Sequence, residues 1–125
     1  IQITTDPNSD PKAIKINAVD KTVTLYQDGI LSLTTGTIRW HNPVNLKVNK
    51  IIARLAEAAD SVVTVVIKKK GVAVKTILIA QNTVKKTETV DISMISDDYL
   101  TVDINTIGTQ NRGSGLAVEF TYSFV

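Results

Sequence analysis

The chain has 125 residues, 43% of them hydrophobic, which suits one domain with a single core. Fourteen basic and twelve acidic residues leave a formal charge of only +2, so the composition does not indicate a nucleic-acid partner. The absence of cysteine excludes disulfides and thiolate sites, and no apolar run approaches the roughly 20 residues of a membrane-spanning helix.

The opening segment is rich in turn-forming residues and begins with Ile1 rather than Met, so we interpret the sequence as a piece of a longer protein. We expect residues 1–30 to be an N-terminal arm or extra strands, and residues 31–125 to be a β-sandwich domain. Within the first segment, alternation at 14–17 and 22–25 predicts two short strands joined by a turn at Asp20 and Lys21.

Alternation of apolar and polar residues continues through the rest of the chain. It is clearest near the C-terminus, where every second residue is apolar or aromatic: Leu116, Val118, Phe120, Tyr122 and Phe124. The pattern predicts further strands at 32–40, 46–55, 62–68, 72–79, 87–92, 99–105 and 116–124. About nine strands with almost no helix favour an all-β fold, an antiparallel β-sandwich of jelly-roll type.

One stretch, residues 49–60 (NKIIARLAEAAD), fits two structures. Its Ala, Leu, Arg and Glu residues are good helix formers, and its apolar residues have helix-like spacing. We predict a strand, because the flanking segments are strands and because Ile51, Ala53 and Leu55 alternate after one bulge. A short helix is the alternative.

No group of residues has the pattern of a catalytic or metal site. The single histidine, His41, lies at a strand end, and no GxSxG elbow is present to offer a serine nucleophile. Asp97 and Asp98 are interpreted as turn residues; a calcium site formed by them with Asp103 is a minor alternative without a known spacing. We therefore predict no enzyme, no catalytic residues, no metal and no cofactor, and the pattern assigns no ligand-binding residues.

Two other features deserve comparison with binding sites. Residues 108–115 (GTQNRGSG) resemble a phosphate-binding loop in composition but lead into a strand rather than a helix, so we predict a hairpin loop that could still contact a ligand. Trp40, with Arg39 and His41, forms a cluster that could stack on a sugar. The commoner role of a lone Trp is to close one end of the core.

From residue 31 onward the chain resembles a small β-sandwich domain of virion proteins of tailed bacteriophages, found in tail fibres, tail tips and surface components. Three stretches carry the resemblance: residues 31–43 (LSLTTGTIRWHNP), 51–79 (IIARLAEAADSVVTVVIKKKGVAVKTILI) and 97–122 (DDYLTVDINTIGTQNRGSGLAVEFTY). The chain departs from the pattern at Lys70, where an Asn is usual before the turn glycine. A two-residue turn would strain Lys70, so we expect a longer turn that uses only Gly71.

The resemblance implies a non-enzymatic building block of the virion that mediates assembly or attachment to the host surface, with other virion proteins and a surface glycan among the partners. The alternative is a carbohydrate-binding module or adhesin domain of a bacterial extracellular protein. Residues 62–67 are apolar on both faces, which places Val62 and Val66 away from the core. This face could be covered by residues 1–30 folded back on the domain or by another copy of the chain, and we expect self-association. A homotrimer is favoured by the likeness to fibre proteins, and a dimer by frequency among oligomers.

Overall fold

A computed structural model describes residues 20–125, which form eight β-strands and no helix. Within this part of the chain no helix could therefore cross a membrane. The strands are rich in Val, Ile and Thr, whose branched side chains suit a pleated surface with one buried face. Their bounds are β1 (Lys21–Ile30), β2 (Thr34–His41), β3 (Leu46–Arg54), β4 (Val63–Lys69), β5 (Val72–Ile79), β6 (Lys85–Met94), β7 (Tyr99–Thr106) and β8 (Ser114–Phe124).

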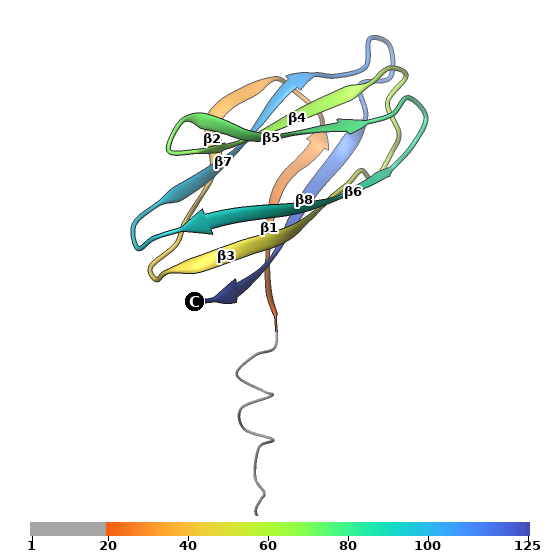
Figure 1. Cartoon of the computed structure of the whole chain (residues 1–125). Helices are drawn as coiled ribbons and strands as arrows, with labels where there is room; N and C mark the ends of the chain where they lie inside the picture. The colour runs from red at the N-terminus through yellow and green to blue at the C-terminus, as the bar shows by residue number, and fades with distance from the viewer. Residues whose placement is uncertain (1–19) are drawn as a thin grey trace, which may run out of the picture.

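The strands form two four-stranded antiparallel sheets that pack face to face (Figure 1). The first sheet has the order β1-β8-β3-β6, and the second has the order β2-β7-β4-β5. Successive strands change sheet at every connection in residues 20–125 except the β4–β5 hairpin. This is the strand order of a jelly roll, in which two Greek keys are wrapped together. The predicted fold class is confirmed.

We expected about nine strands, and the described part of the chain has eight. The additional strand expected at 14–17 lies outside the described residues. The turn expected at Asp20 and Lys21 is wrong, because Lys21 is the first residue of β1 and pairs with Tyr122. From the segment 1–30, expected to be an arm or extra strands, residues 21–30 form β1. This strand pairs with β8 from Lys21 opposite Tyr122 to Ile30 opposite Ser114, and so belongs to the sandwich.

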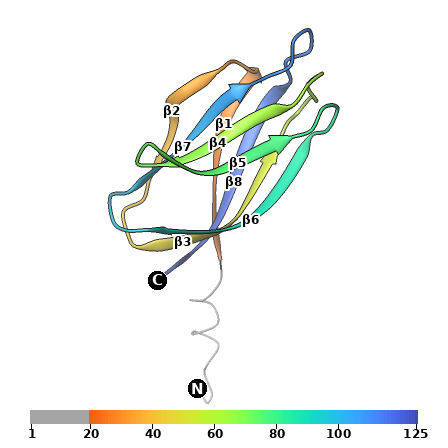
Figure 2. The ribbon, with the colours of Figure 1, turned by 45° about the horizontal axis from the view of Figure 1, so that its top comes forward.

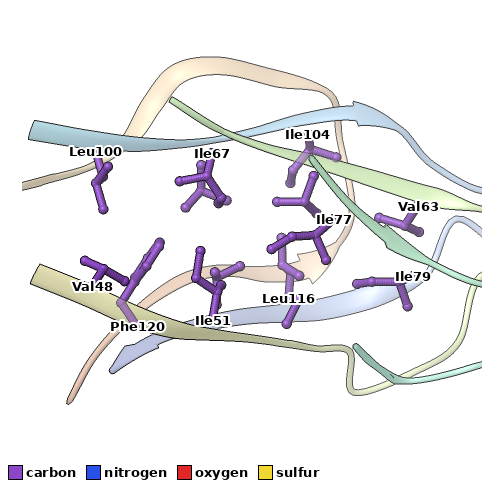
Figure 3. Close-up of a cluster of buried hydrophobic side chains, with 14 of the residues drawn as sticks. Val48, Ile51, Val63, Ile67, Ile77, Ile79, Leu100, Ile104, Leu116 and Phe120 are labelled. Atoms are coloured by element: carbon purple, nitrogen blue, oxygen red, sulfur yellow. The ribbon is translucent and has the colours of Figure 1, made fainter. Parts of the chain in front are cut away.

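The interior is filled by apolar side chains from both sheets. Leu100, Val102 and Ile104 of β7 are buried at 1% exposure or less, as alternation predicts. Figure 3 shows two rows of side chains that face each other across the interior: Leu100, Ile67 and Ile104 from one sheet, and Val48, Ile51 and Leu116 from the other. The core thus joins the two sheets as one unit.

Trp40 lies at the edge of this core. Its ring centroid is 6.1 Å from that of Phe120, in a stacked arrangement, and 5.3 Å from that of Tyr122. The indole therefore packs between the sheets at one end of the sandwich, where it is partly buried. This is the core-closing role considered above.

Residues 49–60 are a strand at their start and a connection at their end. β3 continues to Arg54, and its pairing shifts register between Val48 and Lys50, which is the expected bulge. After it, Ile51 and Ala53 are fully buried. The helical alternative is wrong, because pairing on both sides with β6 and β8 outweighs the helix propensity of a short segment. Residues 55–60 form the link to β4 rather than more strand.

The β4–β5 turn differs from our expectation. Lys69 pairs with Val72, so Lys70 and Gly71 form a two-residue hairpin with φ of 52° and 85°. The expected longer turn is wrong. Two interactions hold Lys70 in this conformation: its N–H donates to the carbonyl oxygen of Tyr99 at 3.0 Å, and its Nζ lies 3.3 Å from Asp98 Oδ1.

The outer face of the β2-β7-β4-β5 sheet is less apolar than the β4 pattern suggested. Val62 is 42% exposed, but Val66 is only 8% exposed, so its neighbours on the sheet already cover it. In the adjacent strand Ile77 and Ile79 are buried in the core, whereas Leu78 points outward and is 53% exposed. The exposed apolar part of this face is therefore formed by Val62 and Leu78.

The connections gather at the two ends of the sandwich (Figure 2). The β3–β4, β5–β6 and β7–β8 loops lie at one end, where Asp60 hydrogen-bonds to residues 109–111 and Asn82 N–H donates to the Ala59 carbonyl oxygen. The β2–β3, β4–β5 and β6–β7 connections lie at the other end.

Candidate functional site

The residues singled out from the sequence do not come together into one site. His41 is exposed at the end of β2, and its ring packs on Tyr99 with 5.1 Å between centroids. Trp40, its neighbour, points to the opposite side of the strand and into the core. The cluster of Arg39, Trp40 and His41 is therefore divided between two faces of the sheet.

The three aspartates considered as calcium ligands also do not form one site. Asp98 is buried in the β6–β7 turn, where it accepts the Ile95 N–H at 2.9 Å and pairs with the ammonium groups of Lys69 and Lys70. The Ile95 N–H, with help from Lys70, holds the pKa of Asp98 below its ordinary value. Within residues 20–125 no three His, Cys, Asp or Glu residues gather in a way that could hold a metal ion.

The loop 108–115 does bind an anion, and the anion is a carboxylate of the same chain. Asp60 accepts backbone N–H groups of Thr109 at 2.7 Å, Gln110 at 2.9 Å and Asn111 at 3.0 Å. These donors, with Asn111 contributing most, keep the pKa of Asp60 below its ordinary value. Successive N–H groups that converge in this way form an anion-binding nest. The resemblance to a phosphate loop is thus explained by an internal ligand.

Replacing Asp60 with alanine should loosen this end of the sandwich, because three backbone N–H groups lose their acceptor at once. We expect Asp60→Ala to lower the Tm by on the order of 5 °C. The matched control is Asp91→Ala, which removes an exposed ion pair with Lys47 and should leave the Tm nearly unchanged. Thermal unfolding followed by circular dichroism measures both, and equal shifts for the two variants would contradict this role of Asp60.

A different site lies on the outer face of the β2-β7-β4-β5 sheet, around Asp103. The side chain of Asp103 points away from the core, yet it is only 1% exposed. Its burial follows from topology, because β7 is a central strand and its outward side chains are flanked by β2 on one side and β4 on the other. A carboxylate in such a place is costly unless it is paired.

The partners of Asp103 come from both flanking strands. β2 shifts register between Thr34 and Ile38, and inside this irregular stretch Gly36 has a φ of 73°. Its N–H is thereby directed at Asp103 Oδ1, at 2.8 Å. From β4, Lys68 Nζ lies 2.9 Å from Asp103 Oδ2. Burial alone would raise the pKa of Asp103, but these two partners outweigh it and the pKa lies below its ordinary value.

Arg39 forms the second charged part of the site. Its guanidinium carbon lies 4.8 Å from the centre of the Tyr99 ring, which is a cation–π distance. One of its nitrogens, Nη2, also donates to the Gly36 carbonyl oxygen at 3.2 Å. These two contacts hold an otherwise exposed arginine against the sheet.

Together these residues surround a hollow of about 310 Å³, which we call the Asp103 basin. Small-molecule sites in proteins have volumes of roughly 300–1,000 Å³, so the basin is at the lower end of that range. Its lining includes Thr35, Gly36, Arg39, Lys68, Tyr99 and Asp103. It combines two cations, one buried anion, an aromatic ring and a hydroxyl group.

Two other hollows are larger, but their side chains are less suited to binding a ligand. One, of about 550 Å³, lies along the side of the sandwich between β5 and β6, where Lys69 and Lys75 are already bound to groups of β6. The other, of about 390 Å³, lies beside the loop that Asp60 holds. We therefore take the Asp103 basin as the candidate site.

Sequence reasoning did not find the basin. Asp103 was considered only as a calcium ligand, and Lys68 only as the last residue of the strand predicted at 62–68. The available signal was Asp103 itself, the one charged residue of β7. Its partners could not be named, because they depend on which strands flank β7 and in which register.

Neither a family model nor a curated protein matches the sequence of this chain. Among solved structures, the globular domain of zebrafish complement 1qA protein is similar over 83% of this chain and 96% of its own, with 5% identity and a TM-score of 0.47. A family 35 carbohydrate binding module from Clostridium thermocellum is similar over 85% of this chain and 92% of its own, with 10% identity and a TM-score of 0.45.

A third similar structure, of infectious bursal disease virus (Gt strain), matches 86% of this chain and 32% of its own, with 14% identity and a TM-score of 0.27. All three TM-scores are below 0.5, so no ligand, partner or assembly is taken from these proteins. The jelly roll rests on the strand order described above, and a fold of this kind does not by itself fix a function.

Proposed function

We propose that this chain is a non-enzymatic structural domain of a tailed-phage virion, which mediates assembly or host-surface attachment by contact. Its working surface is the outer face of the β2-β7-β4-β5 sheet, which carries both the Asp103 basin and the exposed Val62 and Leu78. The location in an extracellular particle is part of the same proposal.

The observation that carries the proposal is the combination of features on the outer face of the β2-β7-β4-β5 sheet. Leu78 is 53% exposed on this face, where a polar residue is expected. The same face carries the charged Asp103 basin. An exposed apolar side chain and a charged hollow on one face suit a surface that is covered by a partner.

The phage assignment is supported by the resemblance, whose three stretches cover most of the sandwich. Residues 31–43 contain β2, residues 51–79 contain the β4–β5 hairpin, and residues 97–122 contain β7 and most of β8. The jelly roll is also a recurrent fold of viral capsid and lectin domains, which are binding and assembly proteins.

The non-enzymatic assignment is supported by the state of the acidic residues. Asp60, Asp98 and Asp103 each accept backbone N–H groups, and the pKa of each is lowered. A general acid requires the opposite, a carboxyl with a raised pKa in a cleft. These three residues instead stabilise turns and the sheet.

The proposed assembly predicts that the chain is a homotrimer associated through Val62 and Leu78. Size-exclusion chromatography with light scattering should give the mass of three chains for the parent. The variant Leu78→Lys should weaken association by about tenfold or more in Kd, because it places a charge in an apolar contact.

The matched control is Tyr26→Lys, which removes a side chain that is 62% exposed from the outer face of the opposite sheet. This variant should associate as the parent does. A monomeric parent would reject the assembly proposal. Equal weakening by both variants would reject the choice of face.

A further inference from the structure

The groups of the Asp103 basin that remain available to a ligand are hydrogen-bond donors. Asp103 is itself out of reach of a ligand, because it is only 1% exposed. Its Oδ1 accepts the Gly36 N–H, and its buried Oδ2 lies 2.9 Å from the Lys68 ammonium without accepting a hydrogen bond. The buried carboxylate holds the Lys68 ammonium in place through the ion pair.

Lys68 and Arg39 provide the donors in surplus. An ammonium has three N–H groups, and that of Lys68 forms an ion pair with Asp103 at 2.9 Å. A guanidinium has five, of which Arg39 uses one on the Gly36 carbonyl oxygen. Two cations and one anion also leave the basin with a net positive charge. Both properties call for an anion with oxygen acceptors.

The shape of the basin restricts the anion further. Arg39 lies over the Tyr99 ring, so its planar fork is held in one orientation, and a carboxylate matches such a fork with two parallel hydrogen bonds. A bare ion would leave most of the 310 Å³ unfilled. The Thr35 hydroxyl and the free donors of Lys68 are suited to the hydroxyl groups of a sugar ring.

We propose that the Asp103 basin binds a carboxylated sugar, with the carboxylate on Arg39 and the ring hydroxyls facing Thr35 and Lys68. This inference rests on the attachment part of the proposed function and gives it a ligand class. It does not depend on assembly, because Leu78 is not part of the basin. The site is a binding site only, since its one carboxylate is occupied and glycoside hydrolysis requires two.

The test is a titration followed by amide chemical shifts of the ¹⁵N-labelled chain. D-glucuronate should shift the amides of Gly36, Gly71 and Thr101 in a saturable way, with a Kd on the order of 1 mM for a single sugar unit. D-glucose lacks the carboxylate and acetate lacks the ring, so each should bind at least tenfold more weakly.

Arg39→Gln should abolish saturable binding of glucuronate while the amide spectrum away from the basin is unchanged. Arg54→Gln is the matched control, because Arg54 lies on the outer face of the other sheet and pairs there with Glu119. No saturable shift, equal binding of acetate, or equal loss in both variants would each overturn the inference. Because mass measurements on Leu78→Lys test assembly alone, a failure here and a failure of assembly are distinguishable.

Discussion

Phe120→Ala is expected to lower the free energy of unfolding by about 3–5 kcal/mol, the range for truncating a buried aromatic side chain. Phe120 is fully buried in β8, a central strand of its sheet, and its ring stacks on Trp40. The truncation removes apolar contact area and leaves a cavity beneath the indole. Denaturation by urea, followed by tryptophan fluorescence, measures the change and reports directly on the environment of Trp40.

Phe124→Ala is the matched control for this truncation. Phe124 belongs to the same strand but is 53% exposed near its end, so the same chemical change should cost less than about 1 kcal/mol. If both variants lost the same stability, the burial assigned to Phe120 would be wrong. A loss below about 1 kcal/mol for Phe120→Ala would lead to the same conclusion.

The fold could be predicted from the sequence because alternation is a local property. In β7 the apolar residues predicted to face inward are buried, and so are Leu116, Val118 and Phe120 of β8. At the end of β8 the prediction weakens, because Tyr122 is partly buried and Phe124 is 53% exposed. The bulge in β3 was also predicted from the alternation. The jelly-roll class follows from many short strands without helices. The order of the strands in the sheets depends on pairing between segments that are remote in sequence, so it could not be predicted from the alternation.

The candidate site was missed for the same reason. Asp103 is buried by the strands on either side of β7, and those strands come from residues about 35 and 65 positions earlier in the chain. Val66 was placed on the correct face, but its low exposure depends on the side chains that surround it. The turn at Lys70 likewise depends on Tyr99 and Asp98, which are remote in sequence.

Removal of the buried carboxylate is expected to have the second large effect. Asp103→Ala should lower the free energy of unfolding by about 3 kcal/mol, near the lower end of the range for breaking a buried ion pair, because Lys68 remains partly exposed and can be solvated. The Gly36 N–H also loses its acceptor. Adding Lys68→Met to this variant should recover part of the loss, since the unpaired ammonium is removed. Chemical denaturation of the four proteins of this cycle measures the coupling between the two residues.

The pH dependence of stability provides a second measurement of the same pair. The pKa of Asp103 is lowered in the folded protein, so the pair stabilises the fold above the ordinary Asp pKa of about 3.9 and this stabilisation is lost as the pH falls through the folded pKa. The parent should therefore lose stability below about pH 4 more steeply than Asp103→Asn, in which position 103 no longer titrates. The remaining acid sensitivity of that variant comes from Asp60 and Asp98, whose pKa values are also lowered. If the free energy of unfolding fell equally below pH 4 in the parent and in Asp103→Asn, the Asp103 carboxylate would not be stabilised in the folded state. The ammonium of Lys68 would then not be held in the basin by a charged partner.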